Sequence, residues 1–142
     1  MCTMVYVASN RPIPLRPWNP AAPAFNVQEL KESEQPVRER FSLPFVCYVG
    51  TDEHCGCGFG YGQYPGYEEE AEAERNKKRV SELREFLASL LSAGAHLELY
   101  ACQADEEGRP ATSTVSLRID EIGGTRFWLE EGQLVHFAEQ SA

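Results

Sequence analysis

The sequence lacks any apolar run long enough to cross a bilayer, which needs about 20 consecutive apolar residues. Its opening residues, MCTMVYVASNRP, have no basic start and only a brief apolar stretch, so the parts of a secretory signal are missing. The five cysteines are odd in number and show none of the spacings of a disulfide scaffold. We therefore expect free thiols in a reducing compartment and a cytoplasmic location.

Positive charge is also scarce in this chain. Its 142 residues include 22 acidic and 13 basic ones, which gives a formal charge of −9. The basic residues cluster only at positions 75–79, within a segment that is rich in glutamate. Because an acidic surface repels phosphate backbones and anionic membranes, we expect neither nucleic acid nor a membrane as a partner. Binding to another protein, or to a second copy of this chain, stays possible.

Length and composition indicate one domain, residues 1–142, because a chain of this size with 42% hydrophobic residues can bury one core. A proline-rich connector, residues 10–26, lies within it, and its prolines favour extended backbone that cannot form a central strand. Arg11, Pro14 and Pro17 have the R-x-x-P-x-x-P spacing that polyproline-binding domains recognise. The simpler interpretation is a connector that packs on its own domain.

Hydrophobic periodicity predicts the main elements of the fold. A long helix is expected from Glu68 to Ser92, with an apolar stripe in its second half and Gly94 at its cap. A short helix is expected at Thr112–Ile122, and residues 26–40 are expected to be a short helix or irregular. Strands are expected at Thr3–Ala8 and at Phe45–Gly50, and the second of these is the likeliest central strand. A strand with one buried face is expected at His96–Cys102. Two further strands, Thr125–Leu129 and Gln133–Phe137, are expected to form a hairpin.

This order of elements predicts an α+β fold, or a small α/β fold, with a mixed sheet of about five strands. One long helix packs on one face of the sheet, and a β-hairpin closes the chain. If the helix after Phe45–Gly50 is a crossover to a parallel strand His96–Cys102, the carboxyl ends of both strands lie at one edge of the sheet.

The most unusual stretch is CGCGFGYG, from Cys55 to Gly62, in which every second residue is glycine. It follows the strand Phe45–Gly50 and precedes the long helix. The crossover would bring Cys55 and Cys57 near Cys102, at the edge where open α/β sheets place their ligand sites.

Two further residues can join this group. Cys2 reaches the same edge if the first strand runs antiparallel to the central one, which the sequence does not decide, and His54 stands beside Cys55. Four thiolates, or three and an imidazole, form the tetrahedral set that zinc takes. We therefore predict a zinc or small-ligand site built from Cys2, His54, Cys55, Cys57 and Cys102, although Cys55-x-Cys57 is not the usual C-x-x-C pair.

Other interpretations of the same residues stay open. Cys55 or Cys57 could be a nucleophile with a lowered pKa, with His54 as its base. Cys2 could be an N-terminal nucleophile if methionine is removed, and MCTMVYVA resembles the openings of some N-terminal-nucleophile amidohydrolases, although the chain is short for their fold. The glycines could also serve packing alone, since they let a backbone or a ring approach closely.

A further alternative is a protein-interaction domain with no site chemistry. Its contact surface would combine the proline connector with the aromatic residues that follow the cysteines, because exposed aromatics anchor interfaces. These aromatic residues are Phe59, Tyr61, Tyr64 and Tyr67.

Taken as a whole, the sequence resembles a group of short uncharacterised bacterial proteins. Their chains open with Met-Cys and a short apolar strand, continue through a P-x-P-L-x-P-W connector and contain a glycine–cysteine motif like HCGCGF. The resemblance covers Met1–Trp18 and Val46–Gly62. It implies no particular activity.

Overall fold

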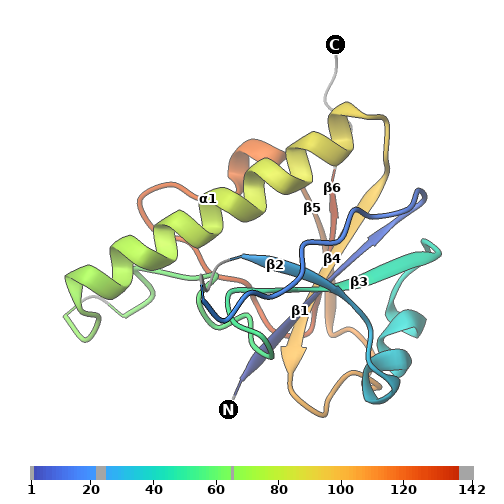
Figure 1. Ribbon diagram of the computed structural model, residues 1–142, viewed down its shortest axis with the longest axis horizontal. Helices are drawn as coiled ribbons and strands as arrows, with labels where there is room; N and C mark the ends of the chain where they lie inside the picture. The colour runs from blue at the N-terminus through green and yellow to red at the C-terminus, as the bar shows by residue number, and fades with distance from the viewer. Residues whose placement is uncertain (1, 22–24, 65, 138–142) are drawn as a thin grey trace.

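The computed structural model describes residues 2–21, 25–64 and 66–137, and it contains a six-stranded sheet with one long helix across one face (Figure 1). The strands are β1 (Thr3–Ser9), β2 (Asn26–Glu29), β3 (Phe45–Gly50), β4 (Leu97–Gln103), β5 (Ser113–Leu117) and β6 (Gln133–Phe137). The helices are α1 (Glu70–Ser92) and two 3-10 helices, η1 (Glu32–Arg40) and η2 (Ile119–Glu121). This arrangement confirms the predicted α+β fold, with six strands in place of about five.

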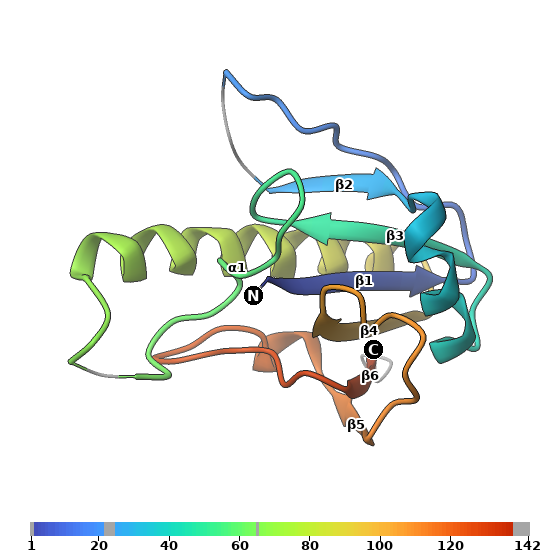
Figure 2. The same ribbon diagram turned by 90° about the horizontal axis from the view of Figure 1, so that it is seen from below.

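The strand order is β2-β3-β1-β4-β6-β5 (Figure 2). Neighbouring strands are antiparallel except β5 and β6, which are parallel. Because β1 lies between β3 and β4 and runs against both, β3 and β4 share one direction without being neighbours. The carboxyl ends of β3 and β4 and the amino end of β1 therefore meet at one edge of the sheet.

The two faces of the sheet are both covered. On one face, α1 packs its stripe of Val80, Leu83, Phe86, Leu87 and Leu90 against residues of β1, β3 and β4. Gly94 follows the helix with a φ of 90°, the left-handed conformation that suits a helix cap. On the other face, η1 and the segment after it cover a second apolar cluster that includes Tyr48, Tyr100 and Leu134. None of the helices in the described part of the chain is long and apolar enough to cross a membrane.

The prediction that the strand at residues 96–102 is buried on one face is wrong. Leu97, Leu99 and Ala101 face α1 as expected, but Glu98 and Tyr100 on the opposite face are each 1% exposed. Both faces are buried because β4 is a central strand and the chain around η1 covers its second side.

Two other predictions need correction. Thr112–Ile122 is not a helix but forms β5 and η2, because Ser113–Leu117 pairs residue by residue with β6. Residues 26–40 begin with the edge strand β2 before η1. In each case pairing with a neighbouring strand overrides local propensity.

The C-terminal pair of strands also differs in its residues. Gln133–Phe137 is β6 as predicted, but its neighbour is β5 rather than Thr125–Leu129. The segment Thr125–Leu129 instead contacts the glycine-rich loop, where the backbones of Phe127 and Tyr61 exchange hydrogen bonds of 2.7 and 3.0 Å.

The proline-rich connector packs on its own domain. Arg16 and Val27 of β2 exchange backbone hydrogen bonds of 2.9 and 2.8 Å, and Ile13 is buried in the cluster under α1. The guanidinium of Arg11 donates to a backbone carbonyl just after α1. Residues 22–24 of the predicted connector lie outside the described residues.

A buried polar cluster fastens the second face of the sheet. The hydroxyl of Tyr6, in β1, is the donor to Glu34 Oε2 at 2.8 Å and to Glu107 Oε1 at 3.0 Å. Glu34 also accepts a 2.9 Å hydrogen bond from the backbone N–H of Lys31. Burial, followed by the two carboxylates, raises the pKa of Tyr6, so the hydroxyl keeps its proton and donates. Tyr6 thus ties η1 and the turn after β4 to the central strand.

We predict that Tyr6→Phe lowers the free energy of unfolding by about 1–3 kcal/mol, because two buried carboxylates lose their shared donor. Urea denaturation measures the change. Tyr67→Phe is the matched control, since Tyr67 is 93% exposed and its hydroxyl carries no burial cost. Equal stability of the two variants would contradict the role given to Tyr6.

Candidate metal centre

The glycine–cysteine loop returns to the sheet beside the start of β1. After β3, the backbone N–H groups of Thr51 and Asp52 both donate to the carbonyl of Cys55 at 3.0 Å, which closes a tight loop. The chain then runs along β1, where Gly56 N–H donates to the Thr3 carbonyl at 2.8 Å. This contact holds the two loop cysteines at the edge of the sheet where β1 begins.

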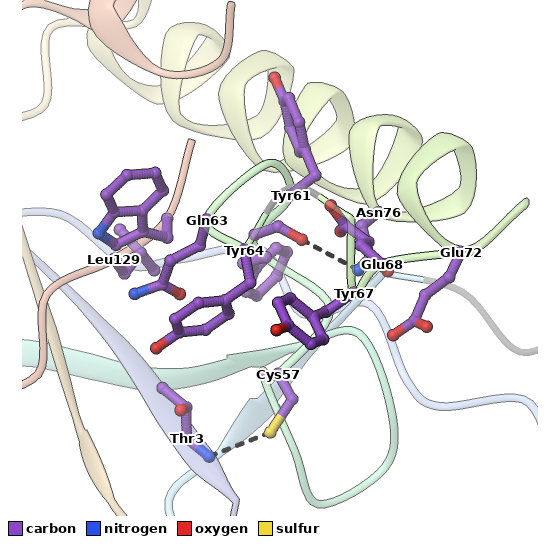
Figure 3. Close-up of a pocket in the computed structure, with 14 residues that line it drawn as sticks. Thr3, Cys57, Tyr61, Gln63, Tyr64, Tyr67, Glu68, Glu72, Asn76 and Leu129 are labelled. Carbon is purple, nitrogen blue, oxygen red and sulfur yellow. Dashed lines mark hydrogen bonds between the residues drawn. The ribbon is translucent and has the colours of Figure 1, made fainter. Parts of the chain in front are cut away.

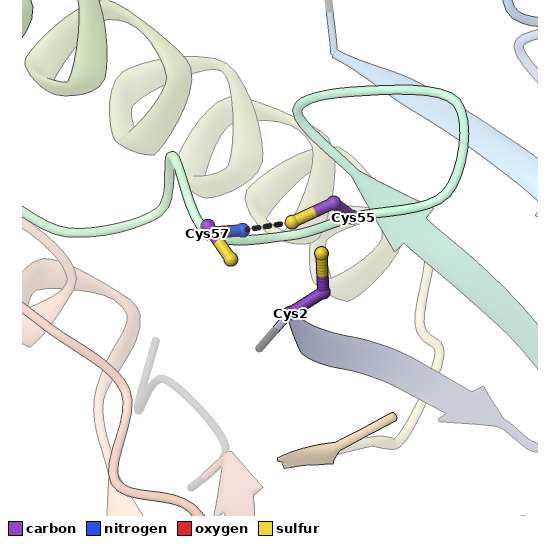
Figure 4. Close-up of side chains that lie close together, drawn as sticks. All are labelled: Cys2, Cys55 and Cys57. Atoms are coloured by element: carbon purple, nitrogen blue, oxygen red, sulfur yellow. Dashed lines mark hydrogen bonds between the residues drawn. The ribbon is translucent and has the colours of Figure 1, made fainter. Parts of the chain in front are cut away.

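Three thiols meet at this edge (Figure 4). The Sγ atoms of Cys2, Cys55 and Cys57 all lie within 4.8 Å of one another. Tetrahedral zinc with Zn–S bonds of about 2.3 Å places its sulfur ligands about 3.8 Å apart, so small rotations of the side chains suffice. The three cysteines therefore lie close enough to bind a metal ion. Cys2 belongs to the group because β1 runs antiparallel to β3, the direction that the sequence left undecided.

Two glycines make this approach sterically feasible. A Cβ at Gly56 would lie 2.7 Å from Val5 Cγ2, and one at Gly58 would lie 2.7 Å from Thr51 Oγ1. Real side chains essentially never tolerate such distances, so Gly56 is needed where the loop lies against β1 and Gly58 where the loop folds back on Thr51. The packing interpretation of the glycines is thus supported, and it is compatible with the thiol cluster that the glycines allow to form.

The side chains between the glycines separate into two groups. Phe59 and Tyr61 are 3% and 4% exposed and belong to the core under α1. Cys55 is half-buried, and Cys57 is exposed. The repeating pattern therefore anchors the loop with aromatic rings on one side and leaves the thiols at the surface.

Backbone donors point at two of the sulfurs. Thr3 N–H donates to Cys57 Sγ and Cys57 N–H donates to Cys55 Sγ, each at 3.2 Å. Such hydrogen bonds stabilise a thiolate once a metal displaces the proton. Without a metal, burial raises the pKa of the Cys55 thiol from 9.0 to about 12, and its neighbours Cys57 and Cys2 contribute to the rise. Near neutral pH, Cys55 is therefore a protonated thiol and not an activated nucleophile.

Two of the predicted ligands lie elsewhere. Cys102 pairs with Met4 on the face of the sheet opposite α1, where it is 2% exposed in the second apolar cluster. His54 lies at the tip of the loop, with Nδ1 2.6 Å from Lys31 Nζ and Nε2 3.7 Å from Glu53 Oε2. The register of β4 places Cys102 on the face opposite α1, and the contacts of the His54 ring are with Lys31 and Glu53. Neither residue belongs to the group of three thiols.

The fifth cysteine, Cys47, is a core residue of β3. It is 8% exposed and packs under α1.

Only two of the four aromatic residues predicted to form a contact surface are exposed. Tyr64 and Tyr67 are 66% and 93% exposed, whereas Phe59 and Tyr61 are buried.

Two cavities flank the loop, and Cys57 lines both of them. The first, of about 400 Å³, lies between the loop, the start of α1 and the segment at Trp128 (Figure 3). The second, of about 360 Å³, is lined by Trp18, Cys55 and the guanidinium side chains of Arg75 and Arg79, among others. Cys57 is thus reachable by small molecules from two sides, and Cys55 from one.

Sequence reasoning missed several residues around the thiols. The charged first half of α1 contains none of the predicted site residues, yet Glu72 and Asn76 line both cavities. Asn76 Nδ2 also donates to the Gly60 carbonyl at 2.9 Å, which fixes the loop to the helix. Trp128 comes from a segment that was expected to pair with β6. No local sequence pattern predicts these contacts, because they depend on how segments far apart in the chain pack together.

We predict that Gly56→Ala displaces the loop from β1 and lowers the free energy of unfolding by about 1–3 kcal/mol, the usual cost of overpacking. It should also increase the rate at which Cys55 reacts with a thiol reagent. Gly108→Ala is the control, since the nearest atom to a Cβ there, Pro36 Cβ, is 3.7 Å away. If both variants matched the parent in stability and thiol reactivity, the loop would not need glycine at position 56 to lie against β1.

The raised pKa of Cys55 predicts its reactivity. In the metal-free protein, its alkylation by iodoacetamide should rise about tenfold per pH unit up to pH 10, because the thiolate fraction is still growing there, whereas an ordinary thiol with a pKa near 8.5 levels off. Mass spectrometry of the Cys55 peptide measures the rate. A plateau reached below pH 8 would instead reveal an activated thiol and would favour the nucleophile.

Comparison with known proteins gives no relative from which to transfer a role: no family model, no curated protein and no solved structure matches this chain. The resemblance to the bacterial group with the Met-Cys opening stays a prediction, and the functional argument depends on the geometry of the site.

Proposed function

We propose that the protein binds a zinc ion through the thiolates of Cys2, Cys55 and Cys57. The observation that carries this proposal is the approach of three sulfur atoms, from two segments more than fifty residues apart, to within 4.8 Å of one another. Three soft sulfur donors favour zinc or another thiophilic metal over magnesium or calcium, which prefer oxygen ligands.

The electrostatic surroundings suit such a site. Zinc with three thiolates has a net charge of −1, and the cavity beside Cys55 and Cys57 is lined by Arg75 and Arg79. Arg79 pairs with Glu82, and Arg75 is exposed in the same lining, which also contains Asp52 and Glu72. The backbone N–H groups of Thr3 and Cys57, which donate to Cys57 Sγ and Cys55 Sγ, stabilise the thiolates.

The number of ligands distinguishes this site from a closed structural zinc site. Structural zinc sites have four protein ligands, whereas sites with three leave the fourth position to water or an exogenous ligand. Among the described residues, the cluster contains three cysteines. We therefore infer a zinc site with one open coordination position, at the surface between two cavities.

We predict that protein purified without added metal contains about one zinc per chain, or takes up one on addition. Replacing Cys2, Cys55 or Cys57 by serine should weaken zinc binding at least tenfold, because each removes a ligand. Elemental analysis and competition with a chromophoric chelator measure content and affinity, and cobalt(II) substitution reports thiolate ligation through charge-transfer absorption. Loss of zinc in the Cys55→Ser/Cys57→Ser variant should also lower the melting temperature.

The controls are Cys47→Ala and Cys102→Ala, which remove thiols outside the cluster and should retain zinc. A folded chain in which Cys2, Cys55 and Cys57 react freely with a thiol reagent and which takes up no zinc would exclude the proposed function. Loss of zinc from Cys102→Ala, with its fold intact, would show that the ligand set is different.

A further inference from the structure

The cavity of about 400 Å³ beside Cys57 is lined mainly by aromatic and acidic side chains (Figure 3). Its volume lies within the range of small-molecule sites, about 300–1,000 Å³. Aromatic side chains form much of its lining, and these are Phe59, Tyr61, Tyr64, Tyr67 and Trp128. Phe59 and Tyr61 are almost fully buried, so a flat apolar group of a ligand meets ring surface mainly from Tyr64, Tyr67 and Trp128.

The charged groups in this lining all have one sign. Glu68 and Glu72 line the cavity, and none of the described residues that line it is lysine or arginine. Glu68 is held in place because its Oε2 accepts a 2.7 Å hydrogen bond from Gly62 N–H. The second cavity, across Cys57, is mixed in sign, because Asp52 and Glu72 line it together with Arg75 and Arg79. An anion is thus disfavoured in the first cavity.

The aromatic rings of the first cavity already attract cations of the protein itself. Lys77 Nζ lies 5.7 Å from the ring centre of Tyr61, and the guanidinium carbon of Arg126 lies 6.0 Å from that of Trp128. Neither cation lines the cavity. Tyr64 and Tyr67, at its entrance, keep most of their surface exposed. Ring faces together with carboxylates are the combination that recognises organic ammonium groups.

We propose that this cavity binds a small aromatic amine, with its ring against the aromatic walls and its protonated amino group toward Glu68 and Glu72. The binding does not require a metal, so this proposal goes beyond the zinc site and does not depend on it. If zinc is also bound, the amine lies beside its open coordination position, because Cys57 forms part of the cavity wall.

The two tryptophans of the chain allow a direct test, because Trp18 lines the second cavity and Trp128 the first. In metal-free Trp18→Phe protein, Trp128 is the only tryptophan, and its fluorescence should change saturably as phenethylamine is added. Phenylacetate has the same ring but a negative charge, and it should bind at least about tenfold more weakly. The use of metal-free protein keeps this result separate from any failure of zinc binding.

Charge-neutralising variants locate the amino group. Glu72→Gln should weaken the binding of phenethylamine about fivefold, near the upper end of the effect expected for one exposed carboxylate. Glu70→Gln is the matched control, since Glu70 lies in the same first turn of α1 but does not line the cavity, and its affinity should be unchanged. The proposal is overturned if the amine and the acid bind equally, if neither binds saturably, or if both variants lose affinity to the same extent.

Discussion

The position of β1 between β3 and β4 is the constraint on which the rest of the structure depends. β1 runs antiparallel to both neighbours, and most of its residues are fully buried. One face of the strand supplies Val5 and Val7 to the core under α1, and the other supplies Tyr6, which holds η1 and the turn after β4. The amino end of β1 is then left at the edge where β3 and β4 end.

That edge is where the glycine-rich loop acquires its chemistry. The loop adds to β1 through the contact between Gly56 and Thr3, and the absence of a Cβ at Gly56 permits the close approach. Cys2, at the entrance to β1, comes within reach of two cysteines more than fifty residues away. A thiol cluster therefore arises from backbone pairing and not from a local metal-binding motif.

The surroundings of the cluster give it two unlike sides. An acidic, aromatic cavity and a cavity with two guanidinium groups share Cys57, Glu72 and Asn76 as common walls. A zinc ion held by three thiolates would face both, with a coordination position free for a ligand. The proposed zinc site would therefore be open to small molecules, unlike a closed structural site.

The sequence by itself determined the elements whose signals are local: the amphipathic helix, the apolar strands at residues 3–8 and 45–50, and the free thiols next to glycines. It also placed Cys55 and Cys57 at a sheet edge, because they follow a strand directly. Only the tertiary structure decided which other residues share that edge. The direction of β1 places Cys2 beside Cys55 and Cys57, and the register of β4 places Cys102 on the opposite face of the sheet. The packing of distant segments places Glu72 and Trp128 in the wall of the cavity beside Cys57. Direction, register and packing depend on contacts between residues far apart in the chain, which short-range patterns do not encode.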